Sequence, residues 1–162
     1  MELKTLYFVD RTLIEEQLTY IERLNDIYRT QRSWVSDIDQ LAFERMVQGW
    51  IEAVVDTGNL LIDGYFMRDP GSYEDIIAIM EDEQVVSKKE SQQLLKLLEQ
   101  RGHVVRQFYR IDSVTLQETV KASWEALQSF PEAVRSFMKQ ETSVHAFKAE
   151  NKQDKDREEP TS

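Results

Sequence analysis

The chain has 162 residues, enough for one domain with a sizeable hydrophobic core. Its formal net charge of −10 argues against a general nucleic-acid binder, which would present a basic face, so we expect no DNA partner. The absence of cysteine excludes disulfides and thiolate metal sites. No apolar run is as long as a membrane span, and residues 1–10 lack the pattern of a signal peptide. We therefore expect a cytoplasmic protein with no membrane partner.

The composition predicts an all-α chain, because glycine and proline are few and no segment alternates apolar and polar residues as a strand would. A first helix is expected over about residues 10–30, and a long second helix over about 37–62. Phe43, Trp50 and Val54 on the second helix cannot all face one small core. This apolar surplus predicts an isologous homodimer.

Asp69-Pro70-Gly71 predicts a turn, because proline fixes φ at one central position and glycine is free to take a positive φ at the next. Ser72 follows as the N-cap of a short helix that is expected to end near Met80, with Asp75 in the place of the usual glutamate of a capping box.

A further helix is expected to begin at the capping box Ser87-Lys88-Lys89-Glu90 and to continue to about Asp112. Its apolar stripe comprises Leu94, Leu98, Val105 and Phe108. Arg101 lies in the middle of that stripe, where a cation is costly unless it is paired or lines a cleft. Asp56 is the first candidate for its counter-charge, with Asn59 as its neighbour on the second helix. The alternative is that Asp56 and Asn59 form a solvent-facing polar edge.

The last helix is expected over about residues 115–138, with a bend or a restart at Pro131. Residues 148–162 are almost entirely polar and are expected to form a disordered charged tail after a single domain over 1–147. The simplest architecture is an antiparallel bundle of four to five helices. His103 and His145 lie far apart in the sequence and outside any ligand motif, so we expect neither a metal nor another cofactor.

Three segments of the chain resemble the HEPN superfamily, and within it the HepT-like branch. The matching residues are VQGWIEAVVDTGN at 47–59, RDPGSYEDI at 68–76 and RGHVVRQFYRID at 101–112. The resemblance extends from about Phe43 to Phe137, and the order and spacing of the segments agree.

The resemblance implies a small helical bundle that dimerises and, in many members, a metal-independent ribonuclease with RNA in the dimer cleft. The signature is an arginine, four to six residues and then a histidine, at the end of a helix that faces the cleft. The histidine can move the 2′-OH proton, and the arginine can stabilise charge on the phosphate. HepT-like members pair as toxins with a nucleotidyltransferase antitoxin of the MNT type, which adenylylates a tyrosine two residues after the histidine.

Carried over to this chain, the signature is degenerate. Arg101 matches the signature arginine, whereas Arg106 stands in the place of the histidine and Gly102 replaces a polar residue. Phe108 stands in the place of the modified tyrosine, so Tyr109, one step later, is the candidate for modification. Arg106 cannot act as a general base near neutral pH, because its pKa exceeds about 12.

Two further roles stay open at this stage. Arg106 is a candidate phosphate contact, since Arg101, Arg106 and Arg110 lie within ten residues that contain no acid. His103 is a candidate base, although residues two apart on a helix differ by about 200° in direction. The chain is thus a HepT-like protein with weakened or lost catalysis, an active ribonuclease that uses Arg101 and an atypical base, or a non-catalytic partner module for a nucleotidyltransferase.

Overall fold

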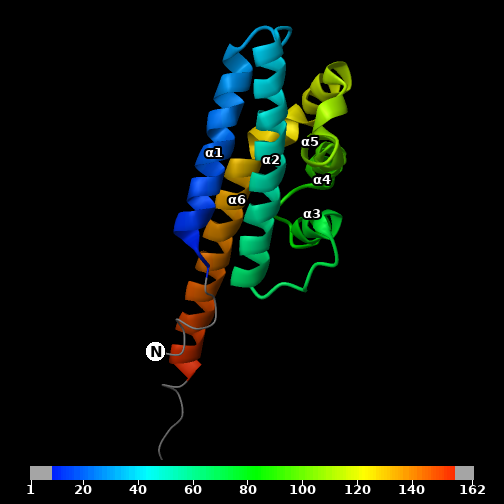
Figure 1. The fold of residues 1–162 in the computed structure, drawn as a ribbon. Coiled ribbons are helices and arrows are strands. Elements are labelled where there is room, and N and C mark those ends of the chain that lie inside the picture. Colours follow the sequence, from blue (N-terminus) through cyan, green and yellow to red (C-terminus); the bar gives the residue numbers. More distant parts are fainter. Residues whose placement is uncertain (1–8, 156–162) are drawn as a thin grey trace, which may run out of the picture.

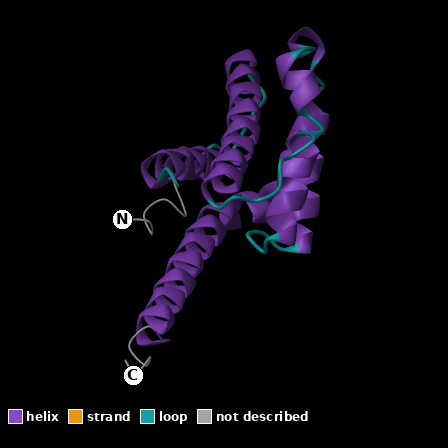
Figure 2. Cartoon of the chain, turned by 90° about the horizontal axis from the view of Figure 1, so that it is seen from below, coloured by secondary structure: helices purple, strands orange, loops and turns teal. Residues whose placement is uncertain are grey.

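The structure, a computed structural model, describes the backbone of residues 9–155 and the side chains of residues 9–142. The elements in chain order are α1 (Arg11–Thr30), α2 (Asp37–Gly64), α3 (Tyr73–Asp82), α4 (Lys88–Leu98), α5 (Arg101–Val105), the 3₁₀ helix η2 (Phe108–Arg110) and α6 (Ser113–Lys155). The long helices α1, α2 and α6 lie side by side, and α3, α4 and α5 lie along one side of α2 (Figure 1). Within the described part, loops join helices and there is no strand (Figure 2).

The helix starts follow the predicted caps. Ser72 Oγ accepts a hydrogen bond from the Asp75 amide at 3.1 Å, and this begins α3. Ser87 and Glu90 form the predicted reciprocal capping box, with N···O distances of 3.1 and 3.0 Å, and this begins α4. Each cap satisfies amides that the first turn of a helix leaves without a partner.

The turn before α3 differs from its expected form. Gly71 has no positive φ. The turn is instead held by the Asp75 carboxylate, which accepts hydrogen bonds from the Gly71 amide and from Arg68 Nη1, both at 2.8 Å. Asp75 therefore binds the turn rather than the amide of Ser72, which corrects the expected capping box at this helix.

The prediction of one continuous helix from 87 to 112 is wrong, because the chain breaks after Leu98. The amide of Gln100 bonds the carbonyl oxygen of Leu97 at 3.0 Å, so the last turn tightens to three-residue spacing before α5 begins. The break rotates the predicted stripe beyond this point. Val104 is the buried residue of α5, and Phe108 is 65% exposed.

Of the bend or restart predicted at Pro131, the restart is wrong, because helix α6 continues through this residue. Proline has no amide hydrogen, so the carbonyl of Leu127, four residues earlier, loses its helical donor. Asn25 Nδ2 of α1 donates to that carbonyl oxygen at 3.0 Å. Asn25 Oδ1 in turn accepts from Trp50 Nε1 of α2 at 3.0 Å, and Asn25 is only 2% exposed. This buried relay joins all three long helices.

The apolar surplus assigned to a dimer interface is absent from the surface. Phe43, Trp50 and Val54 are all buried within one chain, at 1, 0 and 3% exposure. The reason given for a dimer is therefore wrong. Helix α2 packs against α1 and α6 and also against α3 and α5, so its apolar residues are buried on more than one side. The dimer itself stays a prediction.

The backbone of α6 continues to Lys155, so part of the segment expected as a disordered tail is helical in the structure. Residues 156–162 lie outside the described residues. The division into a domain over 1–147 and a tail over 148–162 stays a prediction.

The relay can be tested by a double-mutant cycle. We expect Asn25→Ala to lower the free energy of unfolding by about 2–4 kcal/mol, because it leaves two buried polar groups unpaired and removes a packed side chain. In a Pro131→Ala background the restored amide can bond Leu127, so the cost of Asn25→Ala should be smaller by about 1 kcal/mol. Urea unfolding measures both values. If Asn25→Ala lowers the free energy of unfolding equally in both backgrounds, the hydrogen bond from Asn25 to the Leu127 carbonyl does not contribute to stability in the way described here.

Candidate functional site

Arg101 is the first residue of α5 and is held by residues from two other helices. Its Nε donates to Glu52 Oε1 of α2 at 2.9 Å, and its Cζ lies 4.4 Å from the centroid of the Tyr73 ring of α3. The Arg101 side chain is 23% exposed. An ion pair along one edge and an aromatic ring against one face fix the plane of the guanidinium.

The close approach of α3 to α2 places Tyr73. A Cβ atom at Gly58 of α2 would lie 2.4 Å from Ile76 Cγ2 of α3, so a side chain at Gly58 would push α3 away. Ser72 then begins the helix at Tyr73. The position of the Tyr73 ring against Arg101 thus depends on the close packing at Gly58 and on the N-cap at Ser72.

The expected partner of Arg101 was Asp56, and this is corrected to Glu52, one helical turn earlier on the same line of α2. Helical spacing shows which residues of α2 share one face, but it does not show which of them lies opposite a residue of α5. Asp56 is an exposed residue, but its carboxyl is partly desolvated. This desolvation is the larger cause, and the negative charge of Glu52 the smaller cause, of a pKa above the ordinary value for aspartate. Asn59 is half-buried one turn further on.

His103 and Arg106 are both exposed, His103 in α5 and Arg106 at its C-cap. Within the described part of the chain, no side-chain hydrogen bond, ion pair or ring contact joins either of them to Glu52, Arg101 or Tyr73. The site holds one fixed guanidinium, one exposed guanidinium and an exposed imidazole.

Tyr109, the predicted modification site, lies in η2, which contains no buried residue. The hydroxyl of Tyr109 accepts a hydrogen bond from Arg110 Nη2 at 3.1 Å, and Arg110 Cζ lies 5.0 Å from the centroid of the Tyr109 ring. Tyr109 is 67% exposed, so a large reactant can reach its hydroxyl.

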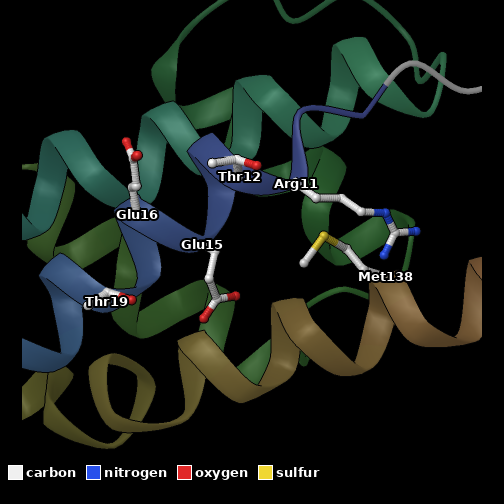
Figure 3. Close-up of a pocket in the computed structure, with 6 residues that line it drawn as sticks. All are labelled: Arg11, Thr12, Glu15, Glu16, Thr19 and Met138. Atoms are coloured by element: carbon white, nitrogen blue, oxygen red, sulfur yellow. The ribbon is translucent and has the colours of Figure 1, made fainter.

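A groove of about 660 Å³ lies elsewhere, between the start of α1 and the later part of α6. Figure 3 shows Arg11 and Glu15 of α1 beside this groove, with Met138 of α6 opposite. Glu15 is bound by Arg135 of α6, so its charge serves the packing of α1 on α6. Among the described residues, no group of three acidic or histidine side chains could hold a metal ion.

The sequence analysis missed Glu52 and Tyr73. A signal for Glu52 was present, since Glu52, Asp56 and Asn59 form a polar line on a helix whose other faces are buried. No comparable signal marked Tyr73, because its role depends on how closely α3 packs on α2.

Comparison with known proteins decides the family. The model of the family described as "Ribonuclease HepT-like" matches residues 14–134. The chain belongs to the HepT-like family. The resemblance of the three sequence segments is thereby confirmed.

A relative and two solved structures are similar to this HepT-like chain. "Putative RNase YutE" of Bacillus subtilis (strain 168) is 44% identical over 144 residues, covering 88% of this chain and 100% of the relative. The structure described as that of a cytosolic protein of unknown function, YutE from Bacillus subtilis, has a TM-score of 0.81 at 44% identity and covers 83% of this chain and 94% of its own.

A second structure, described as a toxin-antitoxin with AMP-PNP, has a TM-score of 0.65 at 17% identity and covers 75% of this chain and 96% of its own. At that identity the likeness concerns the fold. Together the two structures confirm the predicted all-α, HEPN-like bundle. Along the part of the chain that the structure describes, none of the helices is both long and apolar enough to cross a membrane.

The raised pKa of Asp56 gives a prediction for stability. Because the native state binds the proton more tightly than the unfolded state, Asp56 contributes stability below the ordinary value of 3.8 and loses it as pH rises through the raised pKa. Asp56→Asn should therefore raise the free energy of unfolding at neutral pH, by less than about 1 kcal/mol because solvent screens the group. The gain should shrink as pH falls toward about 4.

Urea unfolding across this pH range measures the effect, and Asp63→Asn, two turns further along α2, is the control. If Asp56→Asn destabilises the protein at neutral pH, the carboxylate has a favourable partner and our account of its pKa is wrong.

Proposed function

We propose that this HepT-like protein is the toxin-type member of a toxin–antitoxin pair and binds RNA at Arg101 and Arg106 with little or no ribonuclease activity. The observation that carries the proposal is an asymmetry within the signature. Arg101 is held in place by Glu52 and Tyr73, whereas the position of the proton-transfer histidine is occupied by an exposed arginine.

The chemistry of RNA cleavage explains why this substitution matters. In metal-independent cleavage the 2′-oxygen attacks phosphorus and the bond from phosphorus to the 5′-oxygen breaks. One group must take the 2′-OH proton, and another must give a proton to the leaving oxygen. Arg101 and Arg106 can stabilise charge on the phosphate, but neither guanidinium can accept the proton. General acid–base catalysis typically contributes about 10²–10⁴-fold, and that contribution is missing.

The similar proteins support the substrate class and the partner. The relative named "Putative RNase YutE", which is 44% identical over 88% of this chain, supports RNA as the ligand. A structure with the same fold is described as a toxin-antitoxin, which supports a protein partner. For this chain we propose an MNT-type nucleotidyltransferase as that partner, with Tyr109 as the acceptor of its modification, and a homodimer with RNA in its cleft.

Cleavage and binding of a folded RNA test the proposed site. Purified protein should bind the RNA at low salt and cleave it little. Arg106→His should raise the cleavage rate by about 10²-fold or more, because it restores a group that can transfer the proton. Arg101→Ala should weaken binding and lower the salt slope by about one, because one phosphate contact is lost. Arg23→Ala, the same charge change on an exposed position of α1, is the matched control.

Two outcomes would contradict this proposal. Cleavage by the unmodified protein at the rate of Arg106→His, abolished by His103→Ala, would make His103 the base. Failure to bind RNA at any salt concentration would leave the third interpretation, a partner module without an RNA role.

The assembly can be tested by light scattering. The chain alone should have about twice the 19.1 kDa mass of one copy, as expected for a closed dimer. Co-expression with a nucleotidyltransferase encoded beside it should give a larger complex, and incubation with ATP should add adenylate to Tyr109, as detected by mass spectrometry. A strictly monomeric chain, or an unmodified Tyr109 in a stable complex, would contradict the corresponding part of the proposal.

A further inference from the structure

The 3₁₀ helix η2 presents two aromatic rings to solvent. Phe108 is 65% and Tyr109 67% exposed, and no residue of η2 is buried. Phe43 and Trp50 of the core, by contrast, are at most 1% exposed. Two adjacent large rings that are about two-thirds exposed contribute little to folding through burial. Such a pair therefore indicates a surface that a ligand covers.

The two rings form a defined corner. Their centroids are 5.7 Å apart and their planes are 87° from parallel, which is an edge-to-face arrangement. Arg110 lies over the Tyr109 ring and bonds its hydroxyl, so one face of that ring is covered and its position is held. A flat ligand can stack on an uncovered ring face of this corner.

The charges around the corner select the class of ligand. Arg106 and Arg110 flank the two rings in sequence and are exposed, and residues 101–110 contain no acid. The whole chain carries −10, so a polyanion is attracted to this segment and not to the surface in general. Cations interleaved with exposed aromatic rings are typical of surfaces that bind single-stranded nucleic acid, where bases stack on rings and arginines contact phosphates. In a duplex the bases are already stacked on one another and cannot use the rings.

We infer that η2 is a stacking platform for an unpaired RNA base, which stacks on the Phe108–Tyr109 corner while Arg106 and Arg110 contact the adjacent phosphates. The inference rests on the proposed RNA-binding function and narrows its substrate class to single-stranded RNA. The fixed guanidinium of Arg101 lies seven residues earlier in the same segment.

Fluorescence anisotropy with the full chain tests this inference. The probes are an end-labelled, unstructured single strand of roughly ten nucleotides, within the site sizes of single-strand binders, and a duplex of the same length. Phe108→Leu keeps an apolar side chain but removes the ring. It should raise the Kd for the single strand by about 5- to 100-fold, the loss expected for one stacked base, and leave the Kd for the duplex unchanged. Phe108→Trp should bind the single strand as well as the unmodified protein does.

Phe66→Leu is the matched control, since Phe66 is 69% exposed but follows the C-terminal end of α2, outside the basic segment 101–110. Equal binding of the single strand by Phe108→Leu and the unmodified protein, with Arg101→Ala still defective, would overturn the platform and leave the proposed function standing. An equal loss for single strand and duplex would also overturn it, because stacking would not be the cause. Absence of RNA binding by the unmodified protein would overturn both proposals.

Self-association gives a further readout. If Phe108→Leu binds RNA normally but halves the mass measured by light scattering, the corner is an interface between two copies of the chain and the inference is wrong. Because Phe108 is exposed, we expect Phe108→Leu to unfold at the same urea concentration as the unmodified protein. A loss of binding then cannot be attributed to a loss of fold.

Discussion

One buried amide, the side chain of Asn25, holds the three long helices in register. A buried polar group is tolerated only where its hydrogen bonds are satisfied, and both ends of this amide are: one by the Trp50 indole, the other by the Leu127 carbonyl. The carbonyl is available because Pro131 cannot donate to it. Sliding α1 along either neighbour would leave at least one of these groups unpaired, so the relay specifies a single packing of the bundle in addition to stabilising it.

The site depends on this frame through α2. With its apolar faces occupied by the core, α2 leaves the polar line of Glu52, Asp56 and Asn59 on the side where α3 and α5 pack. Arg101 reaches that line and is fixed by Glu52 and Tyr73. A guanidinium held in this way can stabilise charge without having to reorganise when a phosphate arrives. His103 and Arg106 have no such support, so the segment combines one preorganised cation with an exposed, adaptable surface.

Local rules allowed much of the fold to be predicted, and non-local contacts account for the rest. The starts at Ser72 and Ser87 follow from side chains that bond amides three residues away. The continuity of α6 could not be predicted, because the donor that replaces the missing amide comes from a residue 102 positions away in the sequence. The position of Arg101 in an apolar stripe predicted that it pairs with an acid. The sequence could not show that this acid is Glu52 and not Asp56, because the pairing depends on the register between two helices joined by several loops.

The break after Leu98 connects the fold to the proposed function. In one continuous helix Phe108 would lie on the same apolar stripe as Leu94 and Leu98 and would be buried with them. The chain instead breaks twice: the tightened turn at Gln100 comes before α5, in which Val104 is buried, and the end of α5 at Val105 places Phe108 in η2, where it faces solvent. Between the two breaks Arg101 lies against Glu52 of α2, and Arg106 is exposed. A segment with arginine in the place of the signature histidine thus still presents the fixed guanidinium of Arg101, the exposed guanidinium of Arg106 and an aromatic corner, and these are the features on which the proposed binding of an RNA strand rests.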